Sequence, residues 1–522
     1  MPPARLRAPR EHRGIFALPP LDQAEDLLAA NQIRLSQPIR FLDRPLGELR
    51  ALCQAEARRS AEAHLGCLGL TSLKTASEKW IVSGHQPDLF HPGVWVKNFA
   101  AFGLAQRHGL TPLHLIVDHD TLKSTSIRVP VPSSQPMRTV SVPFDAPADP
   151  TPWEERTVSD EELLARFPAE VAAQITGVRF EPLLPRLWEH VGRLNSPMLA
   201  TRLAGARRRL EGDWGCHSLE LPMSALCRGE AFAWFVGHLL THLPRFQAIH
   251  NQCLLQHRRA RGIRSRNHPV PELAADGDWI EAPFWVWRTE NTERRRVFVR
   301  LRSESLDVRF RPNVWAEIPR HGPPETLVAG LRELEAHGYK IRPRALTTTL
   351  FARLFLADLF IHGIGGAIYD ELNDQIIRAF FGMEPPAFLT LSATMHLPLI
   401  PWHGAAENEG RVRRRLRDLE WNPQRYLPTL EGPQAARSLL REKERLIAWL
   451  PTSAAERRQR FHELRRVTGA LLPHVKTQRR LLETTAARLG QLTQTEMIAR
   501  DRNYAFCLFP ETEMREFMAR FL

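Results

Sequence analysis

Residues 80–87 read Trp-Ile-Val-Ser-Gly-His-Gln-Pro, and residues 113–120 read Leu-His-Leu-Ile-Val-Asp-His-Asp. Each stretch begins with a short apolar run, which is typical of a buried strand, and ends in polar residues. The apolar segment 94–108 between them predicts a helix. A strand, a helix and a second strand at this spacing predict a βαβ unit, and therefore a parallel sheet.

A second unit of the same kind begins near residue 358. Leu359-Phe-Ile predicts a strand, and a glycine-rich loop, His-Gly-Ile-Gly-Gly, follows it at 362–366. Residues 367–381 then predict an amphipathic helix, and 388–391 predict the returning strand. The two units together predict an α/β fold with a parallel-sheet core assembled from about 76–150 and 345–405.

The remaining segments are predicted from their own patterns. Residues 20–75 predict helices, and seven prolines between 130 and 152 predict edge strands and loops. A capping box at Ser159-x-x-Glu162 predicts the start of a helix, with further helices to about 261 and strands within 279–310. We therefore divide the chain into 1–75 (helical), 76–150 (first half of the core), 151–344 (helical and β insertion), 345–405 (second half of the core) and 406–522 (C-terminal helices).

The C-terminal helices carry an apolar seam whose members are three, four and seven residues apart. These are Phe461, Leu464, Val467, Leu471, Val475 and Leu482. The spacing predicts coiled-coil-like packing, and Pro473 predicts a kink within it.

Composition excludes several classes of protein. The chain has 522 residues, and its most apolar long stretch, 347–369, is interrupted by Arg353, Asp358 and His362, so no membrane span is predicted. The basic N-terminus has no apolar segment behind it, so we predict no secretory signal and expect a cytoplasmic protein. Six scattered cysteines without a CxxC pair predict neither a disulfide scaffold nor a zinc site.

The charge of the chain is basic. Its formal net charge is +13, from 71 Lys and Arg against 58 Asp and Glu. Such a surface suits nucleic acid, a nucleotide or an acidic metabolite, because arginine pairs with phosphates and carboxylates. We interpret the arginine clusters at 257–261, 294–296 and 411–417 as solvated helix and strand faces, so a nucleic-acid partner is not expected.

Two groups of polar residues at predicted strand ends are candidates for a functional site. Residues 84–86, Gly-His-Gln, precede a helix whose N-terminus offers free N–H groups to an anion, and His85 and His91 could stabilise charge on a phosphate. Residues 118–120, Asp-His-Asp, could bind Mg²⁺, orient a general base or position an amine. Each group also has a purely structural interpretation, as a polar turn, a cap or a buried histidine.

The glycine-rich loop at 363–366 is the third candidate. Glycine lets the backbone approach a phosphate closely, and the dipole of the following helix favours an anion. A tight structural turn is the alternative. The sequence contains neither a Walker A motif nor a GxGxxG fingerprint.

These residues resemble a known family. The segment Ser83-Gly-His-Gln-x-x-Leu-Phe90, then a helix and a strand that ends in Asp118-His-Asp, is similar to the bacillithiol biosynthesis cysteine-adding enzyme family, which carries Gly-Gln-Gln-x-x-Leu-Phe and Glu-Asp-His-Asp at nearly this spacing. Residues 344–350, Arg-Ala-Leu-Thr-Thr-Thr-Leu, and the later Gly363-Ile-Gly and Tyr369 resemble its Arg-Pro…Thr-Leu segment and its glycine loop. Residues 508–511, Leu-Phe-Pro-Glu, resemble a Leu-Phe-Pro segment near the family's C-terminus.

The resemblance implies a Rossmann-like core with inserted segments and a C-terminal coiled coil that forms a homodimer. It implies a ligase that joins cysteine to the amino group of a small anionic amino-sugar conjugate, glucosaminyl-malate, with an adenine nucleotide (ATP or ADP) as cofactor. Mg²⁺ could accompany the nucleotide. On this basis the expected catalytic residues are His85, Asp118, His119 and Asp120. The expected substrate- and nucleotide-binding residues are Gly84, Gln86, His91, Arg344, Gly363, Gly365 and Tyr369.

The chain departs from the family pattern at several positions. The first Gln of the family loop is His85, the Glu before Asp-His-Asp is Val117, and the Glu of the family's Gly-Gly-Pro-Gly-Glu loop is Gly366. Lys97 lies about two residues before the lysine of the family's first helix. Two alternatives therefore stay open: a nucleotidyltransferase that uses His85 and His91, and a catalytically inactive paralogue that acts as a binding or scaffold protein.

Overall fold

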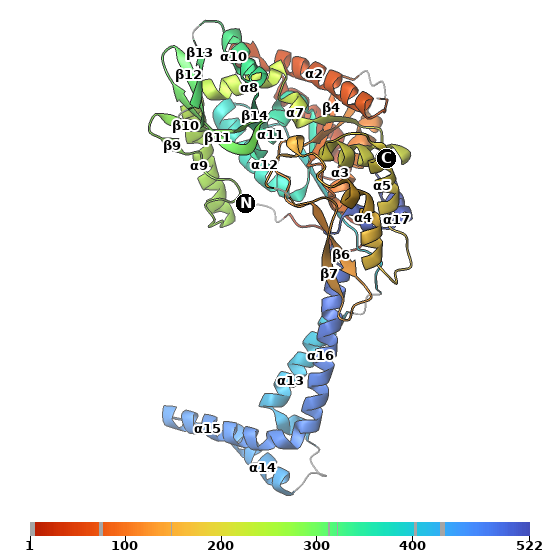
Figure 1. The fold of residues 1–522 in the computed structure, drawn as a ribbon. Coiled ribbons are helices and arrows are strands. Elements are labelled where there is room, and N and C mark those ends of the chain that lie inside the picture. Colours follow the sequence, from red (N-terminus) through yellow and green to blue (C-terminus); the bar gives the residue numbers. More distant parts are fainter. Residues whose placement is uncertain are drawn as a thin grey trace.

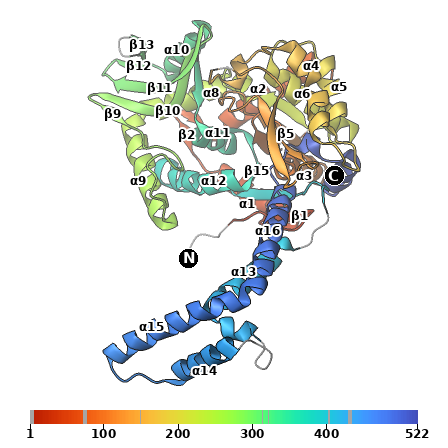
Figure 2. The ribbon, with the colours of Figure 1, turned by 60° about the horizontal axis from the view of Figure 1, so that its bottom comes forward.

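The computed structural model describes residues 6–71, 77–147, 149–311, 314–320, 322–400, 404–427 and 434–522. They form a mixed α/β body from which a long helical arm projects, as Figure 1 and Figure 2 show from two directions. None of the described helices is both long and apolar enough to cross a membrane.

The centre of the body is a six-stranded sheet in the order β1-β16-β15-β4-β5-β8. Five strands run parallel, and β1 pairs antiparallel with β16 at one edge. The strands are β1 Gly14–Leu18, β4 Trp80–His85, β5 Thr111–Ile116, β8 Leu219–Pro222, β15 Leu359–His362 and β16 Phe388–Thr394. The parallel sheet and the two predicted strand–helix–strand units are confirmed. β1 lies where no strand was predicted, and β8 lies where helix was predicted.

Helices cover both faces of this sheet. On one face α3 (Pro92–His108) packs against Ile81, Ile361 and Leu389 in a single apolar cluster. On the other face the apolar residues of the sheet pack against α2 (Leu46–Cys67), α11 (Ala345–Phe351) and α12 (Ile364–Ile376). The helices of the body up to residue 261 are α1 Ala24–Leu35, α2 Leu46–Cys67, α4 Glu161–Gln174, α5 Leu184–Arg193, α6 Leu199–Asp213, α7 Met223–Leu226, α8 Glu230–Thr241 and α9 Leu243–Arg261.

Local sequence signals explain where α3 begins and ends. The Nδ1 atom of His91 accepts a hydrogen bond from the backbone N–H of Gly93, and Pro92 occupies the first turn, where no N–H is needed. Gly109 ends the helix at φ 65°, in the left-handed region that favours glycine. Within the helix, a Cβ at Gly103 would lie 1.7 Å from the carbonyl oxygen of Phe521, so glycine lets the C-terminal segment pack directly on α3.

Two helix starts differ from the sequence prediction. The N-cap of α4 is Asp160, whose side chain accepts from the N–H of Leu163, so the predicted cap at Ser159 is wrong by one residue. The predicted glycine-rich loop is largely helix: Gly363 is the N-cap of α12, and residues 364–366 form its first turn. These glycines therefore present free backbone N–H groups rather than a separate loop.

A second, antiparallel sheet lies beside the first, in the order β13-β12-β11-β10-β14, with β9 paired to β10. Its strands are β9 Ala275–Asp276, β10 Trp279–Arg288, β11 Asn291–Leu301, β12 Ser305–Arg311, β13 Val314–Pro319 and β14 Tyr339–Pro343. Helix α10 (Pro324–Ala336) packs on it. From β14 the chain enters α11 (Ala345–Phe351) and a π-helical turn, Ala352–Leu356, which lead back to the central sheet.

Two short strand pairs complete the β structure. β2 (Arg40–Phe41) pairs with β3 (Arg44–Pro45) ahead of α2, and β6 (Ser126–Val131) pairs with β7 (Arg138–Pro143) after β5. The β6–β7 hairpin lies in the proline-rich segment for which edge strands were predicted, and it lies against the base of the arm.

The arm is an excursion between β16 and the C-terminal segment. Helix α13 (Ala405–Trp421) lies beside α16 (Lys476–Ala499), and α14 (Gln434–Ala448) lies beside α15 (Ala454–Leu471) at the far end (Figure 2). The chain turns at Leu472–Val475, which contains Pro473, so the predicted kink is confirmed. After the arm, α17 (Glu511–Ala519) packs back onto the body.

Candidate functional site

The topology creates a crevice between two neighbouring strands. From β4 the chain passes through α3 to β5 on one side, and from β15 it passes through α12 to β16 on the other side. The two connections diverge from adjacent strands, so β4 and β15 form a switch point of the sheet. Open parallel sheets bind ligands at the carboxyl ends of the strands at such a point.

A cavity of about 600 Å³ lies at this point. It brings together most of the residues that the sequence analysis selected, although they lie up to 285 positions apart. The selected residues that line it are Gly84, His85, Gln86, His91, Gly363, Gly365 and Tyr369. The first four come from the end of β4 and the start of α3, and the other three come from the start of α12.

Two helix N-termini open into the cavity. The first turn of α3 contributes Gly93 and Val94, whose backbone N–H groups already donate to His91. The first turn of α12 contributes residues 364–366, whose backbone N–H groups are free. At Gly363 and Gly365 a Cβ atom would meet no other atom within 4 Å, so the space beside these two glycines of the cavity lining is open. That space is a cradle that a side chain would fill, and its donors suit an anionic group.

Cationic side chains add to this field. Lys97 is buried in α3, and its Nζ atom donates to the carbonyl oxygen of Gly84 at 2.8 Å. Burial lowers the pKa of Lys97 to about 8, so the ammonium form still predominates at neutral pH. Arg502 reaches the cavity from the C-terminal segment, where its Nη2 atom donates to Ser392 Oγ at 2.9 Å, and Lys123 also lines it.

No role was predicted for Lys97 or Arg502 from the sequence. Lys97 carried a usable signal, because it is the single charged residue in the apolar run from Val94 to Ala105. Arg502 carried none, since it lies 418 positions after Gly84 and its approach depends on how the chain returns from the arm.

The two histidines near β4 are neutral and already engaged. Burial lowers the pKa of His85 to about 3, and its ring packs edge-on against Phe90 at 5.0 Å between centroids. Burial likewise lowers the pKa of His91 to about 4, and its Nδ1 atom caps α3. Neither residue therefore brings positive charge to a phosphate at neutral pH.

The predicted Asp-His-Asp cluster does not act as one group. Asp120 accepts from Gln86 Nε2 at 2.9 Å and from Arg294 Nη1 at 3.1 Å, so it holds Gln86 at the cavity rim. Burial opposes its ionisation, but these donors outweigh burial and lower the pKa of Asp120. His119 lies behind the wall, with its Nε2 atom 3.2 Å from the hydroxyl oxygen of Thr348, a cavity-lining residue.

Asp118 points away from the cavity. Its carboxylate accepts from the backbone N–H of Ser224 at 2.9 Å and from the Ser224 hydroxyl. Burial raises the pKa of Asp118, and its side chain faces α7 rather than β4. The expectation that Asp118 contributes to acid–base chemistry with His119 and Asp120 is not supported by this arrangement.

Arg344 is also held within the protein. Its Nη2 atom pairs with Glu281 Oε1 at 2.5 Å, and its guanidinium stacks on Trp285 at 4.4 Å. Arg344 was expected to bind substrate or nucleotide, but the carboxylate with which it pairs belongs to β10 and not to a ligand. Arg344 fixes the start of α11, whose Thr348 and Thr349 line the cavity.

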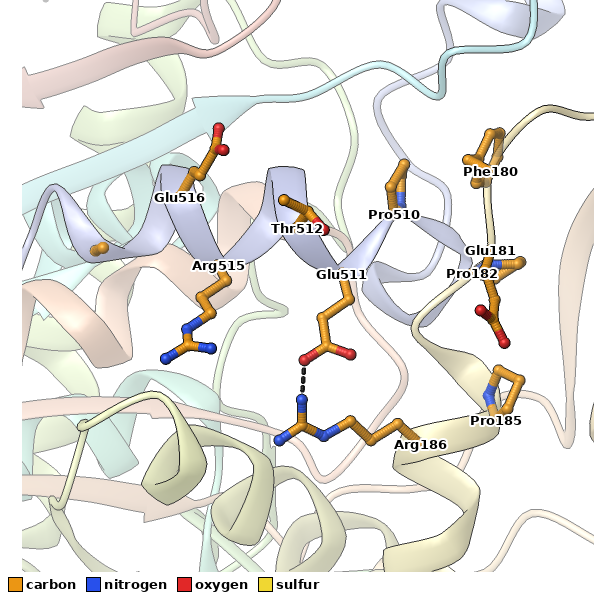
Figure 3. A pocket seen from close by; sticks show the side chains of 11 residues that line it. Phe180, Glu181, Pro182, Pro185, Arg186, Pro510, Glu511, Thr512, Arg515 and Glu516 are labelled. Atoms are coloured by element: carbon orange, nitrogen blue, oxygen red, sulfur yellow. Dashed lines mark hydrogen bonds and ion pairs between the residues drawn. The ribbon is translucent and has the colours of Figure 1, made fainter.

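A second cavity, of about 720 Å³, lies between α5 and α17, far from the strand ends. Figure 3 shows Arg186 and Glu511 pointing toward one another across it, joined by an ion pair. Arg186 also pairs with Asp213, so its charge is already compensated. The cavity at the switch point has free donors and is the better candidate for a ligand.

Within the described residues, no three His, Cys, Asp or Glu side chains come together as a metal ion would require. Neither the protein-family models nor the curated proteins with which the chain was compared give a match. The function is therefore argued from the geometry of the switch point.

Proposed function

We propose that the cavity between β4 and β15 binds the phosphates of an adenine nucleotide, and that the central sheet is a Rossmann-like nucleotide-binding core. The observation that carries this proposal is the convergence of the free N-terminus of α12 and the buried ammonium of Lys97 on one cavity. Free N–H groups and a buried cation both favour a phosphate, and no neighbouring side chain fills the space in front of Gly363 and Gly365.

We further propose that the chain is a ligase that joins cysteine to the amino group of a small anionic amino-sugar conjugate, as the resemblance implies. Amide formation from a free carboxylate requires activation, which a bound nucleotide would supply. Lys97, Arg502 and the first turn of α12 would hold its phosphates, while Gln86, fixed by Asp120, would contact the acceptor. Asp88 is the one carboxylate among the described residues that line the cavity. Because one carboxylate is too few to hold Mg²⁺ alone, the ion would bind together with the phosphates of the nucleotide.

Calorimetry of the full-length protein with ATP, ADP and AMP in the presence of Mg²⁺ tests the first proposal. We expect binding in the micromolar to millimolar range and at least a tenfold loss in Lys97→Met. Lys79→Met is the matched control, because Lys79 is exposed and pairs with Gln32 away from the cavity. Binding that both variants weaken equally, or no binding by the wild type at millimolar nucleotide, would refute the proposal.

The products then separate the ligase from the alternatives. The ligase proposal predicts nucleotide turnover that requires both cysteine and glucosaminyl-malate. A nucleotidyltransferase would release pyrophosphate from ATP with an acid alone. A scaffold protein would show no turnover, and substitutions at Asp118, His119 and Asp120 would change no activity.

A further inference from the structure

His362 occupies a position in the cavity that the proposed function has not used. It is the last residue of β15, next to β4 at the switch point, and it lines the cavity although it is 4% exposed. Its ring lies against Phe360 at 4.4 Å and edge-on to Phe388 at 4.9 Å between centroids. These contacts fix the plane of the imidazole.

The buried side of the ring is paired with a carboxylate. His362 Nε2 lies 2.8 Å from Oδ2 of Asp370, the seventh residue of α12. The same carboxylate accepts from Arg353 Nη1 at 2.7 Å and from the hydroxyl of Thr349 at 2.5 Å. Burial opposes the ionisation of Asp370, but the guanidinium of Arg353 and the hydrogen bonds from Thr349 and His362 hold the carboxylate in its ionised form. Asp370 is therefore an ionised acceptor.

An ionised acceptor decides which nitrogen of His362 carries the proton. Because Asp370 can only accept, Nε2 must donate, and the neutral ring then has its lone pair on Nδ1. Nδ1 is the nitrogen nearer to Gly366, where a Cβ atom would lie 2.9 Å from it. Glycine at this position therefore leaves Nδ1 uncovered, and no other described residue forms a hydrogen bond with it.

His362 differs in this respect from the other histidines of the cavity. Nδ1 of His91 is used as a helix cap, and Nδ1 of His85 lies 3.3 Å from the carbonyl oxygen of Gln86. Among the three histidines in the described lining, His362 alone is paired with a carboxylate.

We propose that His362 is a catalytic proton acceptor of this site, and that Asp370 is the positioning residue that fixes its tautomer. The inference rests on the proposed ligase function. The acceptor nitrogen of the substrate uses its lone pair to form the new C–N bond at the activated acyl carbon. The phosphate-containing leaving group departs with the electron pair of its C–O bond. The proton of the attacking N–H passes to Nδ1 of His362, which later releases it to water.

The tautomer can be measured without knowing the substrate. Full-length protein labelled with ¹⁵N-histidine gives long-range ¹H–¹⁵N correlations that distinguish Nδ1–H from Nε2–H, and His362→Gln assigns the signal. We expect the Nε2–H form in the wild type and its loss in Asp370→Asn. Asp374→Asn is the matched control, because Asp374 pairs with the other terminal nitrogen of Arg353, at 2.6 Å, and not with His362. It should leave the tautomer unchanged.

An activity measurement completes the test. In the cysteine-addition assay we expect His362→Gln and Asp370→Asn to lower kcat by about 100-fold with little change in KM, and Asp374→Asn to lower it far less. An Nδ1–H tautomer in the wild type, or an undiminished kcat in His362→Gln, would overturn the inference while nucleotide binding remained. Absence of nucleotide binding in a protein with the expected tautomer would instead refute the proposed function, and the catalytic use of His362 with it.

Discussion

At the scale of the residue, burial of a charge is the clearest sign of a ligand site. Lys97 lies among apolar side chains of α3, and its ammonium makes one protein hydrogen bond, to Gly84. A buried ammonium with so few hydrogen-bond partners lowers the stability of the folded state. The lowered pKa of Lys97, about 8, reflects this cost of burying the charge. A group that costs stability and faces a cavity is better explained by binding than by folding.

Lys97→Met should therefore stabilise the protein while it impairs binding. In the native protein the pKa lies near 8 instead of 10.5, so between these values the unfolded chain holds a proton that the native chain has lost, and stability rises with pH. Removing the charge should raise the free energy of unfolding at pH 7 by about 2 kcal/mol, after the lost hydrogen bond is deducted.

Denaturant unfolding and phosphate titration at pH 7 and pH 9 measure both effects. Wild-type affinity for phosphate should fall above pH 8, as the ammonium deprotonates, and the affinity of Lys97→Met should be low at both pH values. A destabilised variant that still bound phosphate would show that Lys97 has a structural role.

The glycines of α12 make a second prediction at this scale. Gly365→Ala places a methyl group in the open space of the cradle, so phosphate affinity should fall at least tenfold. Folding should be unaffected or favoured by up to about 0.5 kcal/mol, because a helical alanine restricts the unfolded chain. Gly47→Ala is the control, since Gly47 is likewise the second residue of a helix and also has no neighbour within 4 Å. Equal effects of both substitutions on affinity would contradict the cradle.

At the scale of the element, the structure corrects which residue begins α4. Asp160 caps this helix, whereas the backbone N–H of Ser159 donates to the buried carboxylate of Asp145. Asp160→Ala should lower the free energy of unfolding by about 1 kcal/mol, and Ser159→Ala should change it by a few tenths at most. Urea denaturation of the two variants measures the difference. A larger loss of stability in Ser159→Ala than in Asp160→Ala would show that Ser159 caps the helix, as the sequence predicted.

The elements that the sequence predicted correctly are those with a strong local signal. β4, β5, β15 and β16 are apolar runs bounded by turn residues, and α3 has a cap and a glycine stop. β8 was missed because it has four residues, one of them Glu220, whose burial depends on an ion pair with Arg207. Such a partner is not visible in the periodicity of the strand itself.

The sequence predicted those residues of the candidate site whose position follows from the backbone topology. It did not predict the directions of the side chains. Gly84 and Gly363 lie at strand ends that any parallel sheet brings to one edge. The directions of Asp118 and His119 depend on Ser224 and Thr348, which are 106 and 229 positions away. His362 was within the predicted loop, but its role depends on Asp370, which no spacing rule connects to it.

At the scale of the whole molecule, the arm and the cavity are joined by one short segment. Asp501 and Arg502 follow directly after α16; Asp501 pairs with Arg128 of the β6–β7 hairpin, and Arg502 lines the cavity. The chain then buries Phe506 to Phe509 in the body. The base of the arm is thus fixed to the site, whereas its far end makes no contact with the described body (Figure 1).

The structure of the arm also changes the dimer prediction. The seam predicted over 461–482 is divided at Pro473, so that Val467 and Leu471 pack with Leu440 of α14 while Phe461 stays 53% exposed. The seam is therefore divided at the kink predicted for Pro473, and its first part packs within the α14–α15 pair.

A homodimer through the arm remains a prediction, and α16 is its most suitable face. Leu481 is 68% exposed and Leu492 is 38% exposed, and eleven residues, three helical turns, place both on one side of α16. Exposed leucines on a projecting helix pair favour association with a second copy. Sedimentation of the full-length protein should show a dimer, and Leu481→Glu with Leu492→Glu should dissociate it.

Met497→Glu is the control for this experiment. Met497 is 70% exposed on the same helix, but sixteen residues from Leu481 place it near the opposite side. Met497→Glu should leave the dimer intact, because the new carboxylate would face water in the monomer and in the dimer. A wild-type monomer, or dissociation by Met497→Glu as readily as by the leucine pair, would mean that the arm does not associate through this face.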